Sequence, residues 1–320
     1  MDALLTQESG NKSPNPPTKL IFALSLITRE SDYQQEQAAS AQECGRRVNV
    51  DIEISYADND AIKQSQQLLE VIQNRSHEVN ALIFEPAGNT AFPQVARAAA
   101  SAGLGWVVMN RSDDSIAELR QRFGSPIFSV TENHEETGRI LGRQVAALLP
   151  NGGMLLCVQG PSGSPVSALR LAGMEKTKPS NIDLKLLRSA HWTEEGGYKA
   201  VAGWLRLSTS HDADIVGIMG QSDLITLGAY RAFREHTRAE KKDHWLGLPF
   251  LGVNGLKVGR DAVQRGTLAA TVVVPPSAGV AIESLVRAYR EGVRPLERIF
   301  VTPKSFPELA VLASRTKRSK

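Results

Sequence analysis

Polar and aromatic residues that suit the binding of a small polar molecule are spread along this chain of 320 residues, mostly just after short apolar segments. Amide and guanidinium groups bond neighbouring hydroxyl groups, while an aromatic ring stacks on an apolar ring face. The candidates from the first half of the chain are Tyr33, Glu85, Asn110, Arg111 and Thr131. Those from the second half are Arg170, Trp192, Ser222, Asp223 and Asn254. The set favours a ligand rich in hydroxyl groups, and no residue in it is assigned a catalytic role.

The elements that position these residues follow a regular alternation. Short β-rich segments alternate with longer segments of helical periodicity, which is typical of βαβ units and a parallel sheet. The strands expected in a first sheet are 20–27, 50–56, 81–84, 105–109 and 127–130. Those expected in a second sheet are 154–158, 184–188, 215–219, 250–253 and 270–274, followed by a helix at 277–292 and a strand at 298–302. We predict an α/β protein with two doubly wound lobes, and ligands of such sheets bind at the carboxyl ends of the strands.

Some candidates also have purely structural interpretations. Asp32, Ser164 and Asp223 are residues of the type that caps the N-terminus of a helix. Arg111 and Arg170 are equally consistent with surface ion pairs, and Trp192 with a core position. The local pattern leaves both interpretations open.

Composition argues against nucleic-acid binding and against a membrane span. The net charge of +3 comes from 37 basic and 34 acidic residues that are mixed along the chain, so no strong basic field is expected. No stretch of eighteen apolar residues occurs. Residues 1–18 are polar and contain three prolines, which predicts a disordered leader rather than a secretory signal. Residues 315–320 are expected to form a solvated basic tail.

Metal and cofactor chemistry finds little support. Cys44 and Cys157 are expected to be buried free thiols, and the six histidines show no spacing of metal ligands. The glycine loop at 160–163 resembles a phosphate cradle but lacks the Gly-Lys-Ser/Thr ending of a P-loop. We therefore predict no metal and no cofactor. An enzyme that uses Glu132 or Asp223 as general base is the last-ranked alternative.

Several motifs in order resemble the periplasmic sugar-binding proteins of ABC transporters, of the ribose-binding type, over residues 19–312. They are Asp58-Asn59-Asp60 with Gln64, 81–86, 105–111, Arg170 with Gly173-Met174, 220–223 with 227–229, 251–255 and 266–271. The resemblance implies the type I periplasmic-binding-protein fold, with a three-strand hinge that closes around one ligand. It implies an N-terminal lobe of 19–131 and 275–302, which includes the late helix, and a C-terminal lobe of 132–274 and 303–314.

Carried over position by position, the resemblance makes Tyr33 and Trp192 the rings that stack on a sugar. Asn110 and Asn254 stand where the family has carboxylates, Glu85 where it has an asparagine, and Val274 where it has a glutamine. These departures make ribose itself an unsuitable ligand. Because Arg111 and Arg170 then lack family carboxylates, we hypothesise an acidic sugar, unless Glu85 supplies the countercharge.

The resemblance implies a monomer in the periplasm that hands its ligand to an ABC permease. The alternative is a cytoplasmic ligand sensor, since effector domains of LacI-type repressors share this fold. The polar leader is too short to hold their helix-turn-helix.

Overall fold

The computed structural model describes residues 19–74, 79–88, 92–111, 115–211, 214–237 and 239–318. Their contacts divide the chain into two compact units. Unit 1 comprises the chain up to residue 29, 37–129 and 278–298, and unit 2 comprises 30–36, 130–277 and the chain from 299 onward. The predicted leader lies outside the described residues, and the lobe boundaries implied by the resemblance stay a prediction.

The first sheet has the strand order β11-β5-β4-β3-β1-β2. Its strands are β1 (Leu20–Leu26), β2 (Val50–Tyr56), β3 (Ala81–Phe84), β4 (Gly105–Met109), β5 (Ile127–Glu132) and β11 (Arg298–Val301). Strands β1 to β4 pair in parallel. The helices of this part are α1 (Asp32–Val48), α2 (Ala61–Gln73), α3 (Pro93–Ser101), α4 (Ser115–Arg122) and α12 (Ser277–Glu291).

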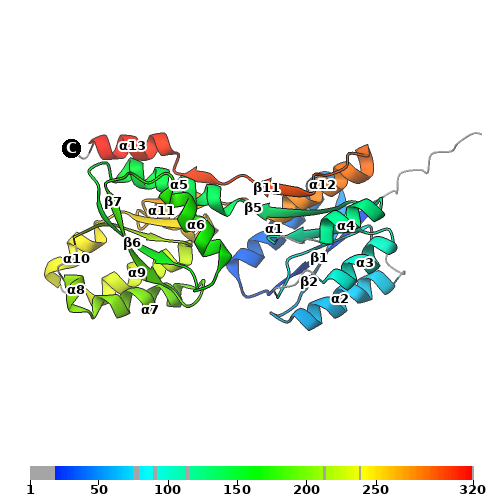
Figure 1. Cartoon of the computed structure of the whole chain (residues 1–320), viewed down its shortest axis with the longest axis horizontal. Coiled ribbons are helices and arrows are strands. Elements are labelled where there is room, and N and C mark those ends of the chain that lie inside the picture. The colour runs from blue at the N-terminus through cyan, green and yellow to red at the C-terminus, as the bar shows by residue number, and fades with distance from the viewer. Residues whose placement is uncertain are drawn as a thin grey trace, which may run out of the picture. The chain divides into compact units, whose positions relative to one another are not determined.

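The second sheet has the order β12-β10-β9-β8-β6-β7. Its strands are β6 (Gly153–Gln159), β7 (Ile182–Arg188), β8 (Ile215–Gly220), β9 (Phe250–Asn254), β10 (Ala270–Val273) and β12 (Lys304–Phe306). Its helices are α5 (His134–Leu148), α6 (Pro165–Glu175), α7 (Glu194–Leu205), α8 (Ser208–His211), α9 (Asp223–His236), α10 (Ala239–Leu246), α11 (Lys257–Gln264) and α13 (Leu309–Arg318). The expected pair of doubly wound α/β lobes is confirmed (Figure 1).

Two elements near the C-terminus were not predicted. Strand β12 pairs antiparallel with β10, so the second sheet is not wholly parallel. Helix α13 runs to Arg318 and takes in the backbone of the first residues of the predicted basic tail. The backbone of residues 315–318 is therefore helical, and the solvated basic tail expected at 315–320 stays a prediction.

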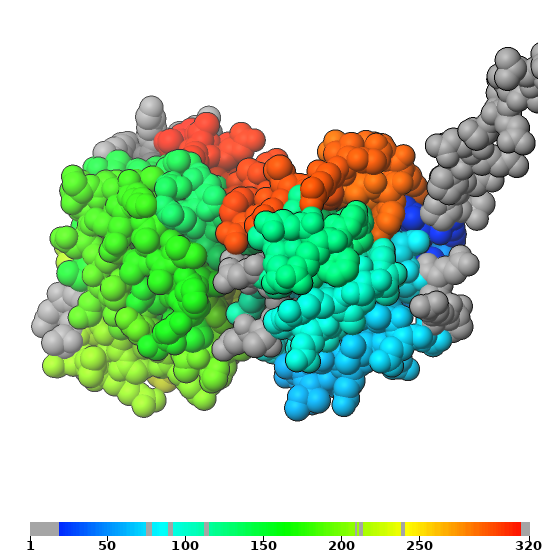
Figure 2. Space-filling view, turned by 45° about the vertical axis from the view of Figure 1, so that its right-hand side comes forward, coloured from blue at the N-terminus to red at the C-terminus, as the bar shows by residue number. Residues whose placement is uncertain are grey.

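Helix α12 packs within unit 1 although it follows the second sheet in sequence. The hydroxyl group of Tyr289 donates to Asn80 O at 2.6 Å, and Ala278 N donates to Gln37 Oε1 at 2.9 Å. Beyond the helix, the Arg120 guanidinium on α4 donates to Pro295 O at 2.8 Å. Figure 2 shows the orange atoms of α12 and its following segment against the green atoms of α4.

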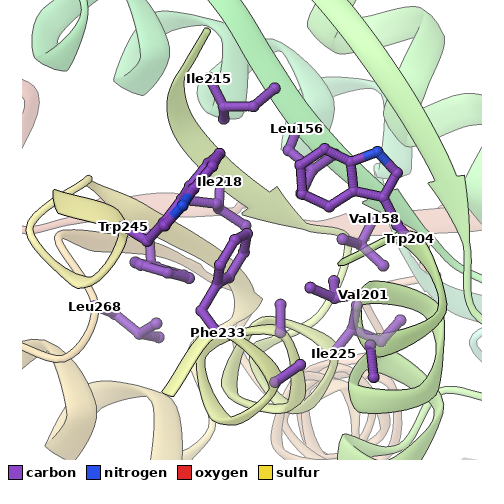
Figure 3. Packing of buried hydrophobic residues seen from close by; sticks show 14 of the residues in the cluster. Leu156, Val158, Val201, Trp204, Ile215, Ile218, Ile225, Phe233, Trp245 and Leu268 are labelled. Carbon is purple, nitrogen blue, oxygen red and sulfur yellow. The ribbon is translucent and has the colours of Figure 1, made fainter. Parts of the chain in front are cut away.

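The core of unit 2 holds α9 firmly against the second sheet. Trp204, Phe233 and Trp245 are nearly fully buried and form one aromatic cluster (Figure 3). The rings of Phe233 and Trp245 stack at 5.1 Å, and Trp204 meets Trp245 edge-on at 6.1 Å. Such pairs each add about 0.5–1.5 kcal/mol beyond the burial of their area. The cluster therefore fixes α9, whose first residues follow β8 at the carboxyl edge of the sheet.

On the face of the second sheet opposite α9, helices α5 and α6 approach each other at two glycines. A Cβ atom on Gly138 would lie 2.1 Å from Arg170 O, and one on Gly173 would lie 1.9 Å from Glu135 O. Only glycine permits backbones to come this close. The contact brings Arg170 on α6 beside the start of α5, where Glu132 ends β5.

Candidate functional site

Arg170 lies at the centre of a polar cluster in unit 2. Its side chain is only 4% exposed. One terminal nitrogen donates to Gln221 O at 2.5 Å. The other donates to both carboxylate oxygens of Glu132 at 3.0 Å and to Asn254 Oδ1 at 2.9 Å. The guanidinium is thus held by residues from the ends of β5, β8 and β9, and the interpretation of Arg170 as a surface ion-pair partner is wrong.

Glu132 supplies the countercharge for Arg170, a partner that the sequence analysis did not assign to it. The Thr137 hydroxyl donates to Glu132 Oε1 at 2.8 Å, and His134 Nδ1 lies 3.2 Å from the same oxygen. Burial opposes ionisation of this carboxyl, but the charge of Arg170 and the contacts with His134 and Thr137 outweigh it and lower its pKa to about 2. A group with so low a pKa is a poor general base near neutral pH.

Trp192 and Asn254 border the guanidinium from two loops. The Arg170 guanidinium carbon lies 5.8 Å from the centroid of the Trp192 ring, which is half-buried. The far edge of the indole rests on Gly160, where a Cβ atom would lie 2.2 Å from the ring. Asn254 has a φ of 95°, in the left-handed region that asparagine tolerates better than most residues. Arg170, Trp192 and Asn254 are the predicted ligand residues that unit 2 brings together.

Ser222 and Asp223 have structural roles. Ser222 Oγ accepts from Ile225 N at 3.1 Å, so Ser222 and not Asp223 caps α9. Asp223 is fully buried, and its oxygens accept from Thr271 Oγ1 at 2.6 Å and from Leu256 N at 3.0 Å. Burial raises its pKa to about 7 against these hydrogen bonds. No part of its side chain is exposed, and through its bond with Leu256 N, Asp223 supports the loop after β9 from the interior of the protein. Among the other proposed caps, Ser164 does cap α6.

The glycine loop after β6 is tied to the protein itself. Gly160 N donates to Gln221 Oε1 at 3.0 Å, Ser167 N donates to the capping Ser164 Oγ at 3.4 Å, and Pro165 has no N–H. A cavity of about 360 Å³ beside the loop is lined by Gln159, Arg188 and the first turns of α6, among other residues. The N–H groups of Gly160 and Ser167 are therefore used within the protein and are not available to a phosphate.

The unit 1 candidates follow neighbouring strands. Glu85 comes after β3, and Asn110 and Arg111 come after β4, which pairs with β3. Glu85 is half-buried, Asn110 has a φ of 59°, and Arg111 is exposed. Because the two strands are parallel, these residues share one edge of the sheet.

Gln64 holds the turn after β3. This fully buried side chain donates to Glu85 O at 2.8 Å and accepts from Ala87 N at 2.8 Å. Asp60 caps α2, the helix that carries Gln64, by accepting from Ile62 N. Asp60 and Gln64 of the motif Asp58-Asn59-Asp60 with Gln64 therefore support the Glu85 turn.

Tyr33 and Thr131 lie in two further elements, α1 and β5. Tyr33 is half-buried in the first turn of α1, and Thr131 is 8% exposed within β5. The ligand contacts of all ten candidates stay predictions.

Both cysteines lie in the interior of the protein. Cys44 and Cys157 are buried free thiols, as expected, and burial raises the pKa of Cys157 to about 12. Within the described ranges, no group of three or more His, Cys, Asp or Glu side chains could hold a metal ion. The helices described there include none long and apolar enough to cross a bilayer.

Comparison with known proteins shows the family. Residues 22–290 match the model of the periplasmic binding protein domain, so the chain belongs to this family of binding proteins. A xylitol-binding protein of Mycolicibacterium smegmatis is 25% identical over 98% of this chain and 85% of its own length.

Solved structures show the same fold. An ABC transporter periplasmic solute binding protein from Actinobacillus succinogenes with bound D-allose has a TM-score of 0.75 at 20% identity, covering 94% of this chain and 100% of that one. An ABC transporter solute binding protein from Bacillus halodurans with bound myo-inositol has a TM-score of 0.70 at 19% identity, covering 95% of this chain and 99% of that one.

Proposed function

We propose that this protein is the solute-binding component of an ABC-type import system and binds one uncharged sugar or polyol without changing it. The observation that carries the proposal is the group formed by Arg170, Trp192 and Asn254, called here the Arg170 frame. In it, a buried guanidinium lies beside a half-exposed indole and an asparagine amide. Guanidinium and amide groups suit adjacent hydroxyls, and the indole suits a C–H face. The ligand would contact Arg170, Trp192 and Asn254 in unit 2. The contacts that the resemblance carries over for Tyr33, Glu85, Asn110 and Arg111 stay predictions.

The preference for an uncharged ligand follows from the charge balance in unit 2. Glu132 lies 3.0 Å from Arg170 through both oxygens, so the arginine charge is already compensated. A ligand carboxylate placed beside this pair would lose its hydration and meet the Glu132 charge as well. The hypothesis of an acidic sugar assumed that both Arg111 and Arg170 lacked a countercharge. Because Arg170 has one in Glu132, we propose an uncharged ligand instead.

The relatives support the same class of ligand. The names and titles of the similar proteins mention xylitol, D-allose and myo-inositol, which are all uncharged and rich in hydroxyl groups. Membership of a family of binding proteins favours binding over catalysis, as does the low pKa of Glu132. By the same family argument, the protein would act as a monomer in the periplasm and deliver its ligand to a permease after closing around it.

A thermal-shift screen tests the proposal with xylitol, myo-inositol, D-allose, gluconate and glucuronate as probes. A ligand at one hundred times its Kd stabilises by about 2.7 kcal/mol, which corresponds to about 5–10 °C in Tm for a unit of this size. We expect at least one neutral probe to reach this shift and the acids to give none. Stabilisation by the acids alone would contradict the charge argument, and no shift with an extended panel of sugars and polyols would contradict the binding function.

The matched control removes the guanidinium without leaving a buried charge unpaired. Arg170→Met combined with Glu132→Gln takes away both partners of the pair, which is tolerated far better than removing one. This double variant should unfold cooperatively and lose the shift given by the neutral probe.

A further inference from the structure

Gln221 lies under the Arg170 frame and connects the loops around it. Its side chain is fully buried. Its Oε1 accepts from Gly160 N at 3.0 Å and from Ser167 Oγ at 2.5 Å, while its Nε2 donates to Ser167 O at 2.9 Å. All of these partners belong to the loop after β6 or to α6. One amide group thereby joins the end of β8 to the segment that carries Arg170.

The backbone of Gln221 also holds the guanidinium directly. Its carbonyl oxygen accepts from Arg170 at 2.5 Å, and its own N–H donates to Val158 O at 3.0 Å in β6. Ser167 lies three residues before Arg170, so the two side chains project from the same face of α6. The side chain of Gln221 therefore fixes the helical turn from which Arg170 extends, and its carbonyl fixes the far end of the same side chain.

A second connection reaches Trp192. The indole rests on Gly160, the residue whose N–H is bonded by Gln221. Movement of the Gly160 loop would change the support of the ring as well as the position of α6.

We propose that Gln221 is a positioning residue for the ligand site, setting the orientation of Arg170 and of Trp192 at once through Ser167 and Gly160. The proposal rests on the proposed sugar or polyol binding. Gln221 is not itself one of the predicted ligand-binding residues. Its role differs from general core stability because its partners are the supports of two binding side chains.

Gln221→Leu tests the proposal against a matched control, Gln144→Leu. Gln144 is also a fully buried glutamine of unit 2, but it donates to Thr271 O and Ser305 Oγ at 2.9 Å, away from the Arg170 frame. Both variants lose buried hydrogen bonds, so both should unfold at lower urea concentration. Only Gln221→Leu should weaken binding of the neutral probe from the thermal-shift screen, by about tenfold or more, with Gln144→Leu within about twofold of wild type.

A spectroscopic measurement separates positioning from stability without any ligand. Trp106, Trp204 and Trp245 are at most 4% exposed, so acrylamide quenching reports on Trp192. Quenching of the folded protein should change in Gln221→Leu and stay at the wild-type value in Gln144→Leu. If Gln221→Leu folds poorly, Ser167→Ala removes one of the same bonds and should weaken binding a few-fold.

Two results would overturn the proposal. They are unchanged affinity in folded Gln221→Leu and an equal loss in Gln144→Leu. If the wild type binds no sugar or polyol, the proposed function fails, while the quenching comparison still tests whether Gln221 positions Trp192.

Discussion

Replacing Glu132 by glutamine separates the charge balance of unit 2 from its shape. The substitution keeps the size of the side chain and removes the negative charge that faces Arg170 at 3.0 Å. A pKa that falls from 4.5 to about 2 on folding corresponds to about 3 kcal/mol of stability at neutral pH. Breaking one half of a buried ion pair costs about 3–5 kcal/mol, which agrees. We expect Glu132→Gln to lose about 3 kcal/mol at pH 7.

The pH dependence of this loss has a definite sign. Because folding lowers the pKa of Glu132, its contribution is present above pH 4.5 and disappears as the pH falls through that value toward 2. Urea unfolding followed by tryptophan fluorescence at pH 7, 5 and 3 should show the gap between wild type and Glu132→Gln closing as the pH falls.

The control is Glu135→Gln, which removes a half-exposed carboxylate that pairs with Arg139 and Lys176. Such a pair contributes about 1 kcal/mol at most. If Glu132→Gln loses no more than Glu135→Gln, or if its deficit is the same at every pH, the inference that Glu132 neutralises Arg170 is wrong.

Three further predictions concern Asp223, Trp192 and Gly173. Burial raises the pKa of Asp223 to about 7, so ionisation of this carboxyl in the unfolded chain opposes folding as the pH rises from about 4 to 7. The difference in free energy of unfolding between wild type and Asp223→Asn, measured in urea, should shrink over that range. Parallel pH profiles of the two proteins would refute this. Trp192→Phe should abolish most acrylamide quenching, because the other tryptophans are at most 4% exposed, and the neutral ligand should protect wild type from quenching. Gly173→Ala should lose about 2 kcal/mol or more in urea unfolding because its Cβ would lie 1.9 Å from Glu135 O, whereas Gly203→Ala, with nothing within 4 Å in α7, should gain about 0.5–1 kcal/mol; equal effects would refute the close contact of α5 and α6.

The strands were predictable because their apolar segments end sharply at polar residues. The predicted segment 50–56 coincides with β2, and 154–158 lies within β6. Strand β12 was missed because three residues, Lys304–Phe306, carry too little pattern to distinguish a strand from a loop. Helix α13 was missed because its last residues are mainly basic and polar, and such a segment is equally typical of a solvated tail.

The candidate site was only partly predictable. The rule that ligands meet the carboxyl ends of parallel strands selected Trp192 and Asn254, and both side chains lie beside Arg170. Their contacts with a ligand stay a prediction. The pairing of Arg170 with Glu132 joins residues 38 positions apart, and no local pattern encodes it. Adjacent Ser222 and Asp223 both suit a helix cap, and only the geometry of the first turn distinguishes the capping serine from the buried carboxyl beside it.

Calorimetric titration of the full chain with the best neutral polyol or sugar from the screen tests the central claim most directly. We predict one ligand per chain, recovered chemically unchanged from the complex, with binding lost in the Arg170→Met, Glu132→Gln double variant. Undiminished binding in that folded variant, or a ligand recovered in altered form, would contradict the account.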